Sequence, residues 1–172
     1  MKANVWRITA VIVAAAAAFF VIAAIAVCAV FPNKYAQKVN AAADEFGLDR
    51  ALVRAVVWAE SRFDANAVSK KGAAGLMQLM PETYNMCANA LGIENKDGGK
   101  FDPENSLRCG CYYLSVMRDK FDGDMTAALM AYNAGEANAK KFLSGADVFP
   151  ETKKYLDDIK KARRVYGLFG GG

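Results

Sequence analysis

An unbroken run of 24 uncharged residues, from Ile8 to Phe31, constrains the fold of this chain more than any other feature. As a helix rising ~1.5 Å per residue, the run would be about 36 Å long, which is enough to cross a hydrocarbon layer of ~30 Å with some tilt. We therefore expect a single transmembrane helix over residues 8–31, preceded by a short tail over residues 1–7.

Two other fates of this apolar run stay open. Cleavage near Ala24 to Ala26 would make it a signal peptide, although the apolar stretch of a signal peptide usually spans only ~7–15 residues. Residues 25–28 faintly resemble a lipoprotein processing site, but Val27 is large for one. Basic residues flank both ends of the run, so charge alone orients it only weakly. The very short N-terminal tail favours a single-pass protein of the cell membrane, held in the bilayer by residues 8–31, with the following domain on the extracytoplasmic side.

Composition excludes several kinds of chemistry after this run. The chain contains no histidine, which removes Ser-His and Cys-His nucleophile pairs and the commonest zinc sites. The formal net charge is +4, and Lys2 and Arg7 contribute two of these charges. The remainder is too slight to argue for nucleic-acid binding, and no basic patch interleaved with aromatic residues is present. Acid–base chemistry must therefore come from carboxylates, tyrosines, lysines or cysteines.

A second apolar stretch predicts a buried helix that ends in one carboxylate. Apolar residues occupy almost every face from Ala51 to Ala59, and Asp49 precedes them as an N-cap. Glu60 stands at the end of this helix. Desolvation disfavours the charged form of a carboxyl group, and a carboxylic acid that keeps its proton near neutral pH can donate it to a leaving group. The alternative is a structural glutamate at a helix C-terminus that pairs with Arg54, Arg62 or water.

The rest of the chain predicts an all-α domain. Caps, prolines at first helical positions and glycines after helix ends mark the boundaries. No stretch alternates β-branched and polar residues, so we expect no strand. Tyr155, Ile159, Ala162 and Tyr166 recur on one face of the last segment, which indicates an amphipathic helix. The expected helices cover residues 33–46, 49–61, 81–91, 103–120, 125–134 and 136–143, with a last one from residue 150 onward.

Four blocks of residues then follow one another in a fixed order. They are Glu60–Asp64 with Ala67–Ser69 and Gly72–Thr83; Asp102–Asn105 with Gly110 and Tyr113–Leu114; Ala127–Gly135; and Pro150–Thr152 with Tyr155. Together they resemble the signature of the soluble lytic transglycosylase domain, a family related to goose-type lysozyme. The resemblance covers about residues 38–168. It implies a lysozyme-like helical domain over residues 38–169, joined to the anchor by a juxtamembrane segment, residues 32–37. The closing glycines, residues 170–172, are expected to be disordered.

The resemblance also assigns roles to individual residues. It implies that Glu60 is the catalytic acid, and it places five further residues in contact with the substrate or in the polar network of the cleft. These are Ser69, Gln78, Tyr132, Asn133 and Glu151. Met80 is a further candidate for contact with the substrate, and core filling is its alternative. Gln78 stands among apolar neighbours, and a buried amide there must find partners, which sugar hydroxyl or acetamide groups can supply. Tyr84, Tyr112 and Tyr113 are weaker candidates for stacking on sugar rings, and we expect each to be a core residue.

A single carboxylate requires an unusual mechanism, because ordinary glycosidases use two. The resemblance implies that Glu60 protonates the oxygen between N-acetylmuramic acid and N-acetylglucosamine in peptidoglycan. The 6-hydroxyl of the muramic acid then closes a 1,6-anhydro ring, which needs no metal and no cofactor. Two alternatives stay open at the same site: hydrolysis by water, as in a muramidase, and an idle glycan-binding or scaffold module in an envelope assembly. The sequence names no protein partner.

The cysteines allow one disulfide outside the apolar run. Cys87 is expected on the helix after Pro81, and Cys109 and Cys111 on the helix after Pro103. If these helices pack together in an oxidising setting, a bond from Cys87 to Cys111 is the preferred pairing. Three buried thiols are the alternative. A zinc site is not expected, because histidine and a fourth ligand are lacking.

Overall fold

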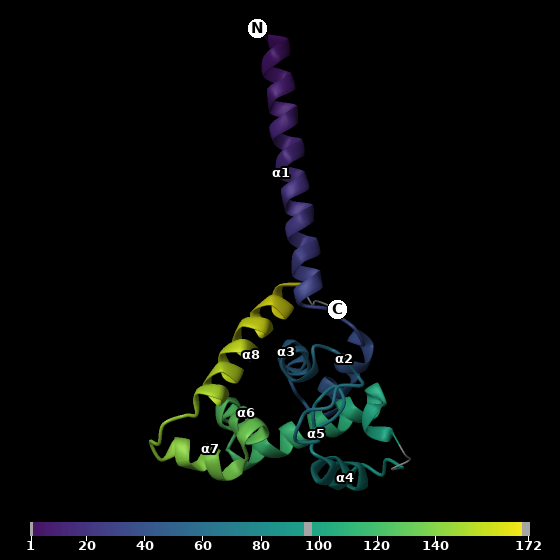
Figure 1. The fold of residues 1–172 in the computed structure, drawn as a ribbon, viewed down its shortest axis with the longest axis vertical. Helices are drawn as coiled ribbons and strands as arrows, with labels where there is room; N and C mark the ends of the chain where they lie inside the picture. Colours follow the sequence, from purple (N-terminus) through teal and green to yellow (C-terminus); the bar gives the residue numbers. More distant parts are fainter. Residues whose placement is uncertain (1, 95–97, 170–172) are drawn as a thin grey trace. The chain divides into compact units, whose positions relative to one another are not determined.

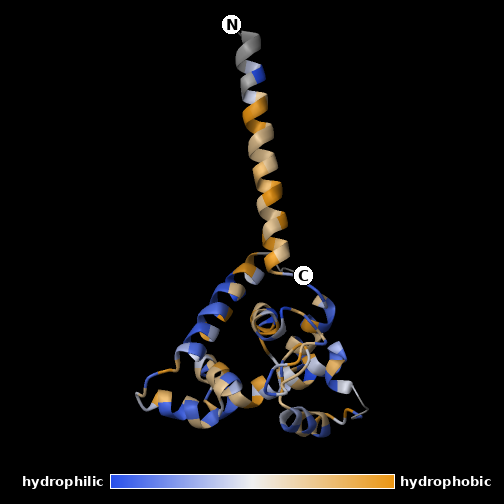
Figure 2. Ribbon diagram, in the orientation of Figure 1, coloured by the Kyte–Doolittle hydropathy of each residue, from blue (hydrophilic) through white to orange (hydrophobic). Residues whose placement is uncertain are grey.

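The computed structural model describes residues 2–94 and 98–169, which form two compact units divided between Pro32 and Asn33. The predicted disorder of residues 170–172 lies outside the described residues. The first unit is a single helix, α1 (Lys2–Val30), and the orange colour in Figure 2 shows that most of it is apolar. Its segment Thr9–Val30 has a mean hydropathy of 2.9 over its most apolar window. By length and composition, this helix can cross a membrane.

The second unit is built from helices, as predicted (Figure 1). Within the described residues, its only β-type pairings are isolated bridges that join Ala74 to Val68 and to Leu79. One short 3₁₀-helix, η1, lies where the sequence predicted only a loop. The elements of this unit are α2 (Ala36–Glu45), α3 (Arg50–Ser61), α4 (Pro81–Ala90), η1 (Gly99–Phe101), α5 (Pro103–Lys120), α6 (Met125–Ala134), α7 (Glu136–Leu143) and α8 (Pro150–Phe169).

Helix α3 forms the centre of this unit. Every side chain from Leu52 to Trp58 is buried, which confirms the interpretation of this stretch as a buried helix. Helix α8 packs along α3 and also contacts α6, while α5 contacts α2, α4 and α6. The predicted apolar face of α8 is the one that packs, because Ile159, Ala162 and Tyr166 are all buried. The end of α3 is therefore enclosed by helices from distant parts of the chain.

Side-chain caps explain why three of these helices begin where they do. The carboxylate of Asp49 accepts a hydrogen bond from the Leu52 N–H at 2.6 Å, which confirms the predicted cap of α3. Asp102 accepts from the backbone N–H groups of the next helix, α5, in the same way. Asp124 does so for α6. Each bond satisfies a donor that would otherwise lack a partner at the start of its helix.

Two consecutive residues with left-handed backbone follow the end of α3 and begin the long loop that leads to α4. Arg62 and Phe63 have φ angles of 54° and 62°. Farther along the loop, Gly75 (φ 77°) passes so close to its neighbours that a Cβ atom there would lie 2.2 Å from the Lys100 carbonyl oxygen and 2.7 Å from Ser106 Oγ. The loop thus fits against η1 and α5 only because this residue lacks a side chain.

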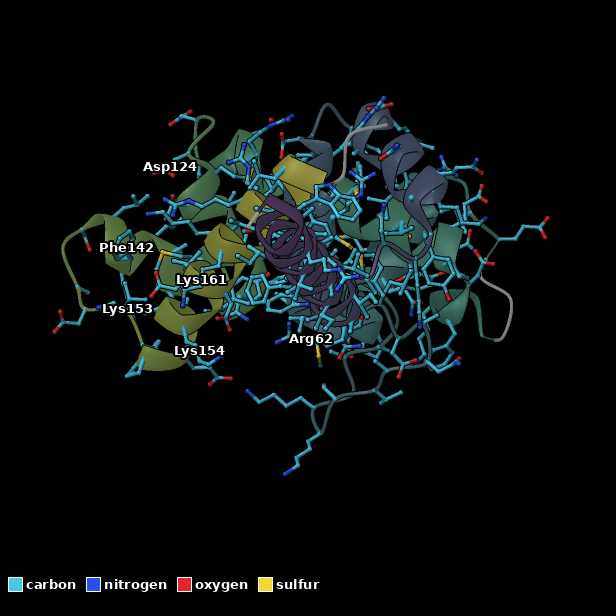
Figure 3. The ribbon with its side chains drawn as sticks, turned by 90° about the horizontal axis from the view of Figure 1, so that it is seen from above. Arg62, Asp124, Phe142, Lys153, Lys154 and Lys161 are labelled. Carbon is cyan, nitrogen blue, oxygen red and sulfur yellow. The ribbon has the colours of Figure 1, made fainter. Side chains whose placement is uncertain are left out.

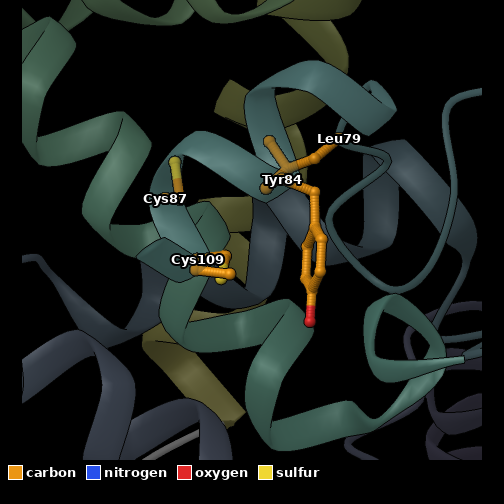
Figure 4. Packing of buried hydrophobic residues seen from close by; sticks show 5 residues of the cluster. Leu79, Tyr84, Cys87 and Cys109 are labelled. Atoms are coloured by element: carbon orange, nitrogen blue, oxygen red, sulfur yellow. The ribbon is translucent and has the colours of Figure 1, made fainter. Parts of the chain in front are cut away.

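The cysteines correct one expectation. All four are free, so the disulfide from Cys87 to Cys111 is not formed, and the alternative of buried thiols describes the structure. Cys87 packs instead in an apolar cluster with Cys109, Leu79 and Tyr84 (Figure 4). Residues 109 and 111 are two positions apart on α5, about 200° around the helix, so they occupy different faces. The cysteine of α5 that packs with Cys87 is therefore Cys109 and not the expected partner, Cys111. Burial raises the pKa of the Cys87 thiol to about 11 and that of Cys109 to about 12.

The close approach at Gly75 generates a stability prediction. We expect Gly75→Ala to lower the free energy of unfolding by about 2–4 kcal/mol, because it combines a left-handed alanine with overpacking against α5. Gly72→Ala is the matched control: its φ of 88° is equally unfavourable for alanine, but nothing lies within 4 Å of the added Cβ. That variant should lose only about 1 kcal/mol. Denaturant unfolding of the full chain in detergent measures both, and equal losses would contradict the clash.

Candidate active site

An open cleft of about 600 Å³ lies where the end of α3, the loop after it, α6 and the start of α8 meet. All seven residues that the sequence analysis assigned to the site line this one cleft. They lie at the end of α3, in the loop after it, on α6 and at the start of α8. The two that are farthest apart in the sequence are separated by 91 positions. The seven are Glu60, Ser69, Gln78, Met80, Tyr132, Asn133 and Glu151.

Glu60 holds a half-buried carboxyl group on the last turn of α3, facing the cleft. Burial raises the pKa of this carboxyl from 4.5 to about 7, and a hydrogen bond from Tyr155 acts in the opposite direction. The group is therefore protonated in a large fraction of molecules near neutral pH, as expected for a desolvated acid. Neither arginine considered as its partner takes that role. Arg54 donates to the side chains of Asn33 and Asn40. The Arg62 guanidinium lies 3.3 Å above the Trp58 ring.

Tyr155 is the partner of Glu60, and the sequence analysis did not assign it to the site. Its hydroxyl group, on α8, donates a hydrogen bond of 2.8 Å to Glu60 Oε1. Burial, helped by the neighbouring Glu60 and Tyr132, raises the pKa of this hydroxyl well above 10, so it remains a donor. The bond holds one carboxyl oxygen of Glu60, a residue that lines the cleft. The only signal in the sequence was the place of Tyr155 in the fourth block.

The loop over residues 62–80 forms one wall of the cleft, and three helices hold it in place. Ser61 Oγ on α3 donates to the Leu76 carbonyl at 2.9 Å. The Met77 N–H donates to Ser106 Oγ on α5 at 3.3 Å. The hydroxyl group of Tyr132 on α6 donates to the Met77 carbonyl at 2.7 Å. The side chain of Met77 lies so near α5 that a Cβ at Gly110 would meet it at 2.5 Å.

Gln78 occupies this wall in a left-handed conformation, with a φ of 46°. Its side-chain nitrogen donates to the Ala67 carbonyl at 3.0 Å and to the Gly75 carbonyl at 2.9 Å. The amide nitrogen thus finds its partners inside the loop rather than in a ligand. A strained residue beside a cleft is a frequent mark of a functional position.

The other cleft residues present polar and apolar groups to a ligand. Ser69 Oγ accepts from the Ala73 N–H at 3.0 Å, while Asn133 and Glu151 are exposed. Met80 is 40% exposed, which is unusual for a methionine that only fills a core. The aromatic ring of Tyr113 lines the cleft and packs on Tyr132 with ring centroids 5.4 Å apart.

The remaining candidates lie elsewhere. Tyr84 is buried in the core, as expected, and Tyr112 packs edge-on against Phe46, with ring centroids 5.8 Å apart. Asp64, four residues after Glu60, is exposed and does not line the cleft. Among the described residues, no group of three or more cysteines and carboxylates could hold a metal ion. Glu60 and Glu151 are the two carboxylates that line the cleft, and only Glu60 is shielded from water.

Comparison with known proteins places this geometry in a family. The model of the Transglycosylase SLT domain matches residues 37–154. The chain is 39% identical over 108 residues to the peptidoglycan transglycosylase gp16 of Escherichia phage T7, covering 61% of this chain and 8% of that protein. It is 31% identical over 152 residues to the membrane-bound lytic murein transglycosylase C of Photorhabdus laumondii, covering 81% of this chain and 39% of that protein. The chain therefore spans less than half the length of these curated relatives.

Solved structures agree with this placement. An inactive mutant of the lytic transglycosylase Slt from Pseudomonas aeruginosa matches with a TM-score of 0.75 and 29% identity, over 80% of this chain and 24% of that one. The 70 kDa soluble lytic transglycosylase of Escherichia coli matches with a TM-score of 0.75 and 25% identity, over 82% of this chain and 25% of that one. The likeness extends over most of this chain, and it confirms the all-helical fold predicted from the sequence.

The bond from Tyr155 to Glu60 yields a prediction about ionisation. In Tyr155→Phe the carboxylate loses a donor, so we expect the pKa of Glu60 to rise above its value of about 7. Observing the Glu60 carboxyl carbon by NMR while the pH is raised measures this directly. Tyr113→Phe is the matched control, because it removes a cleft hydroxyl that is not bonded to Glu60. An unchanged titration in Tyr155→Phe would contradict the arrangement.

The buried acid also makes stability depend on pH. The folded state holds the Glu60 proton up to a pKa of about 7, whereas the unfolded state releases it near 4.5. Folding stability contributed by this group is therefore complete below about pH 4.5 and is lost as the pH rises through 7. Glu60→Gln carries no such loss. We expect the free energy of unfolding of Glu60→Gln, relative to that of the unaltered chain, to increase by roughly 2–3 kcal/mol as the pH rises from about 4.5 to about 7. Parallel curves of unfolding free energy against pH would contradict the burial.

Proposed function

The chain belongs to the transglycosylase SLT domain family, and we propose that it is a lytic transglycosylase that cleaves the β-1,4 bond between N-acetylmuramic acid and N-acetylglucosamine in peptidoglycan. The observation that carries this proposal is the Glu60 carboxyl group, which is half-buried in the cleft and has a pKa of about 7. Such an acid can hold a proton and release it at the same pH, and the relatives named above are peptidoglycan or murein transglycosylases.

In the first step, Glu60 donates its proton to the glycosidic oxygen. The bond from this oxygen to C1 of the muramic acid breaks, and the N-acetylglucosamine leaves as an alcohol. Tyr155 holds one carboxyl oxygen at 2.8 Å, so the other oxygen is the one that delivers the proton. The carboxylate that remains accepts the bond from Tyr155, and this bond offsets part of its desolvation.

In the second step, the 6-hydroxyl oxygen of the muramic acid forms a bond to C1, and its proton passes to the Glu60 carboxylate. The acid is regenerated, and the product carries a 1,6-anhydro ring. An attacking group that belongs to the substrate is already close to C1, so it has the advantage of an intramolecular reaction over a free water molecule. This route uses one carboxylate, in agreement with a cleft that shields only Glu60 from water.

The remaining cleft residues would hold the glycan strand during these steps. In this proposal Ser69, Gln78 and Met80 contact the sugar from the loop wall. Tyr132 and Asn133 line the cleft from α6, and all five residues border the same cleft as the acid. Glu151, on the first turn of α8, takes part in the polar network at the edge of the cleft.

We also infer how the chain is placed in the cell. Relatives of this chain are named as membrane-bound, and the segment Thr9–Val30 is long and apolar enough to span a membrane. In the proposal this helix is a single-pass anchor in the lipid bilayer, and the domain acts on the extracytoplasmic side, where peptidoglycan lies. The anchor would keep the enzyme near the glycan strands closest to the membrane.

Replacement of the acid tests the proposed activity. We expect Glu60→Gln to reduce the release of muropeptides from purified peptidoglycan by about 10²–10⁴-fold, the range of general acid–base catalysis, while its helix content is preserved. Asp64→Asn is the matched control: it removes an exposed carboxylate four residues away, outside the cleft, and should leave the rate close to that of the unaltered chain. Equal rates for Glu60→Gln and the unaltered chain would indicate an idle, glycan-binding module.

The chemistry of the released ends separates transglycosylation from hydrolysis. Mass spectrometry of the muropeptides should find 1,6-anhydromuramic acid ends, because the substrate supplies the attacking oxygen. Reducing ends would instead show that water attacks, as in a muramidase. The measurement uses the full chain in detergent, so the anchor does not interfere with the comparison.

A further inference from the structure

Two lysines line the cleft, and the proposed mechanism gives them no role. Lys70 and Lys71 follow Ser69 in the loop wall, and both border the same cleft as Glu60 and Gln78. Both side chains are exposed. A long ammonium side chain at the edge of a cleft can reach a charged group on a ligand without itself being buried.

The backbone that carries these lysines is fixed. Ser69 and Gly72 close a tight turn, in which the Gly72 N–H donates to the Ser69 carbonyl at 3.0 Å. Lys70 and Lys71 are the two corner residues of that turn. The Ser69 N–H donates to the Ala73 carbonyl at 2.8 Å, and the Ala73 N–H donates back to Ser69 Oγ at 3.0 Å. The turn therefore presents both ammonium groups from one defined position.

The charges around this turn favour an anionic ligand. In the part of the chain that the structure describes, neither lysine forms an ion pair with a carboxylate. The other charged groups that line the cleft are Glu151 and Glu60, and the pKa of Glu60 of about 7 keeps much of it neutral. Two cations thus share the lining of the cleft with one exposed carboxylate, so the lining carries an excess of positive charge.

We propose that Lys70 and Lys71 form a subsite for a carboxylate carried by the glycan strand, and that this subsite makes the enzyme prefer strands with ionised carboxyl groups. The inference rests on the proposed function, since it takes peptidoglycan as the ligand. The carboxylate can come from two sources on the muramic acid: the acidic groups of an attached peptide, or the lactyl carboxyl that is exposed when the peptide is absent. An ammonium group bonds to either source in the same way.

The test compares three substrates and two double variants of the full chain in detergent. The substrates are strands with intact peptides, strands stripped of peptides by an amidase, and intact strands whose carboxyl groups have been converted to amides. Lys70→Gln/Lys71→Gln removes the proposed subsite. Lys160→Gln/Lys161→Gln is the matched control, because it removes two adjacent exposed lysines of α8 that do not line the cleft; Figure 3 labels Lys161 on that helix. The readouts are kcat/KM and the Kd of each strand for the same variants in a Glu60→Gln background.

We expect the unaltered chain to favour intact over amidated strands by about three- to tenfold, as one or two screened ion pairs would allow. The Lys70→Gln/Lys71→Gln variant should lose this preference in both kcat/KM and Kd, and the α8 control should keep it. If stripped strands have the kcat/KM and Kd of intact strands, the lactyl carboxylate is sufficient for binding to the subsite. If they have the values of amidated strands, the subsite binds the carboxylates of the peptide. Both results support the subsite.

If Lys70→Gln/Lys71→Gln keeps the full preference for intact over amidated strands, the proposed subsite is wrong. It is also wrong if the control Lys160→Gln/Lys161→Gln loses that preference to the same extent. Failure of the proposed function has a different signature: no strand yields anhydro ends with the unaltered chain. In that case the Kd ratios still decide the inference, because they are measured without catalysis.

Discussion

The cost of removing one carboxyl group from water determines how this domain is built. Glu60 can hold a proton near neutral pH only if its surroundings exclude solvent, and a buried charge is expensive unless it has a partner. Helix α3 meets the first requirement, because its side chains from Leu52 to Trp58 are all buried. Helix α8 meets the second through Tyr155. The packing of α8 against α3 therefore has two effects. It buries the core, and it brings the Tyr155 hydroxyl group to the Glu60 carboxyl group.

The sequence predicted those parts of the structure that depend on local chemistry. Aspartates at helix starts are recognisable because a short carboxylate reaches the free N–H groups of the first turn, and Asp49, Asp102 and Asp124 all do so. The α8 face was predictable because its apolar residues repeat with the period of a helix. The grouping of the site residues in one cleft came from a different source, the resemblance of four ordered blocks to a known family. Their roles stay a prediction.

Contacts between distant residues were not predictable in this way. Tyr155 lies 95 positions from Glu60, and no spacing rule connects them. The choice of Cys111 as the partner of Cys87 failed because it needed the rotation of α5 relative to α4, which neither helix encodes alone. The amide of Gln78 was expected to need a ligand for its hydrogen bonds, but the loop supplies two backbone carbonyls. Each of these outcomes depends on tertiary packing, where local propensity has little influence.

The hydrogen bonds that hold the loop wall have a consequence for the proposed binding of a sugar strand. Leu76 and Met77 are tied through their backbone to α3, α5 and α6, so this side of the cleft behaves as part of the helical body and not as a jaw that swings shut. Under the proposed function, a wall that does not move cannot adapt its shape to the glycan strand. Any distortion of a sugar ring during the reaction would then have to occur in the saccharide, and contacts along the rest of the strand would supply the free energy for it.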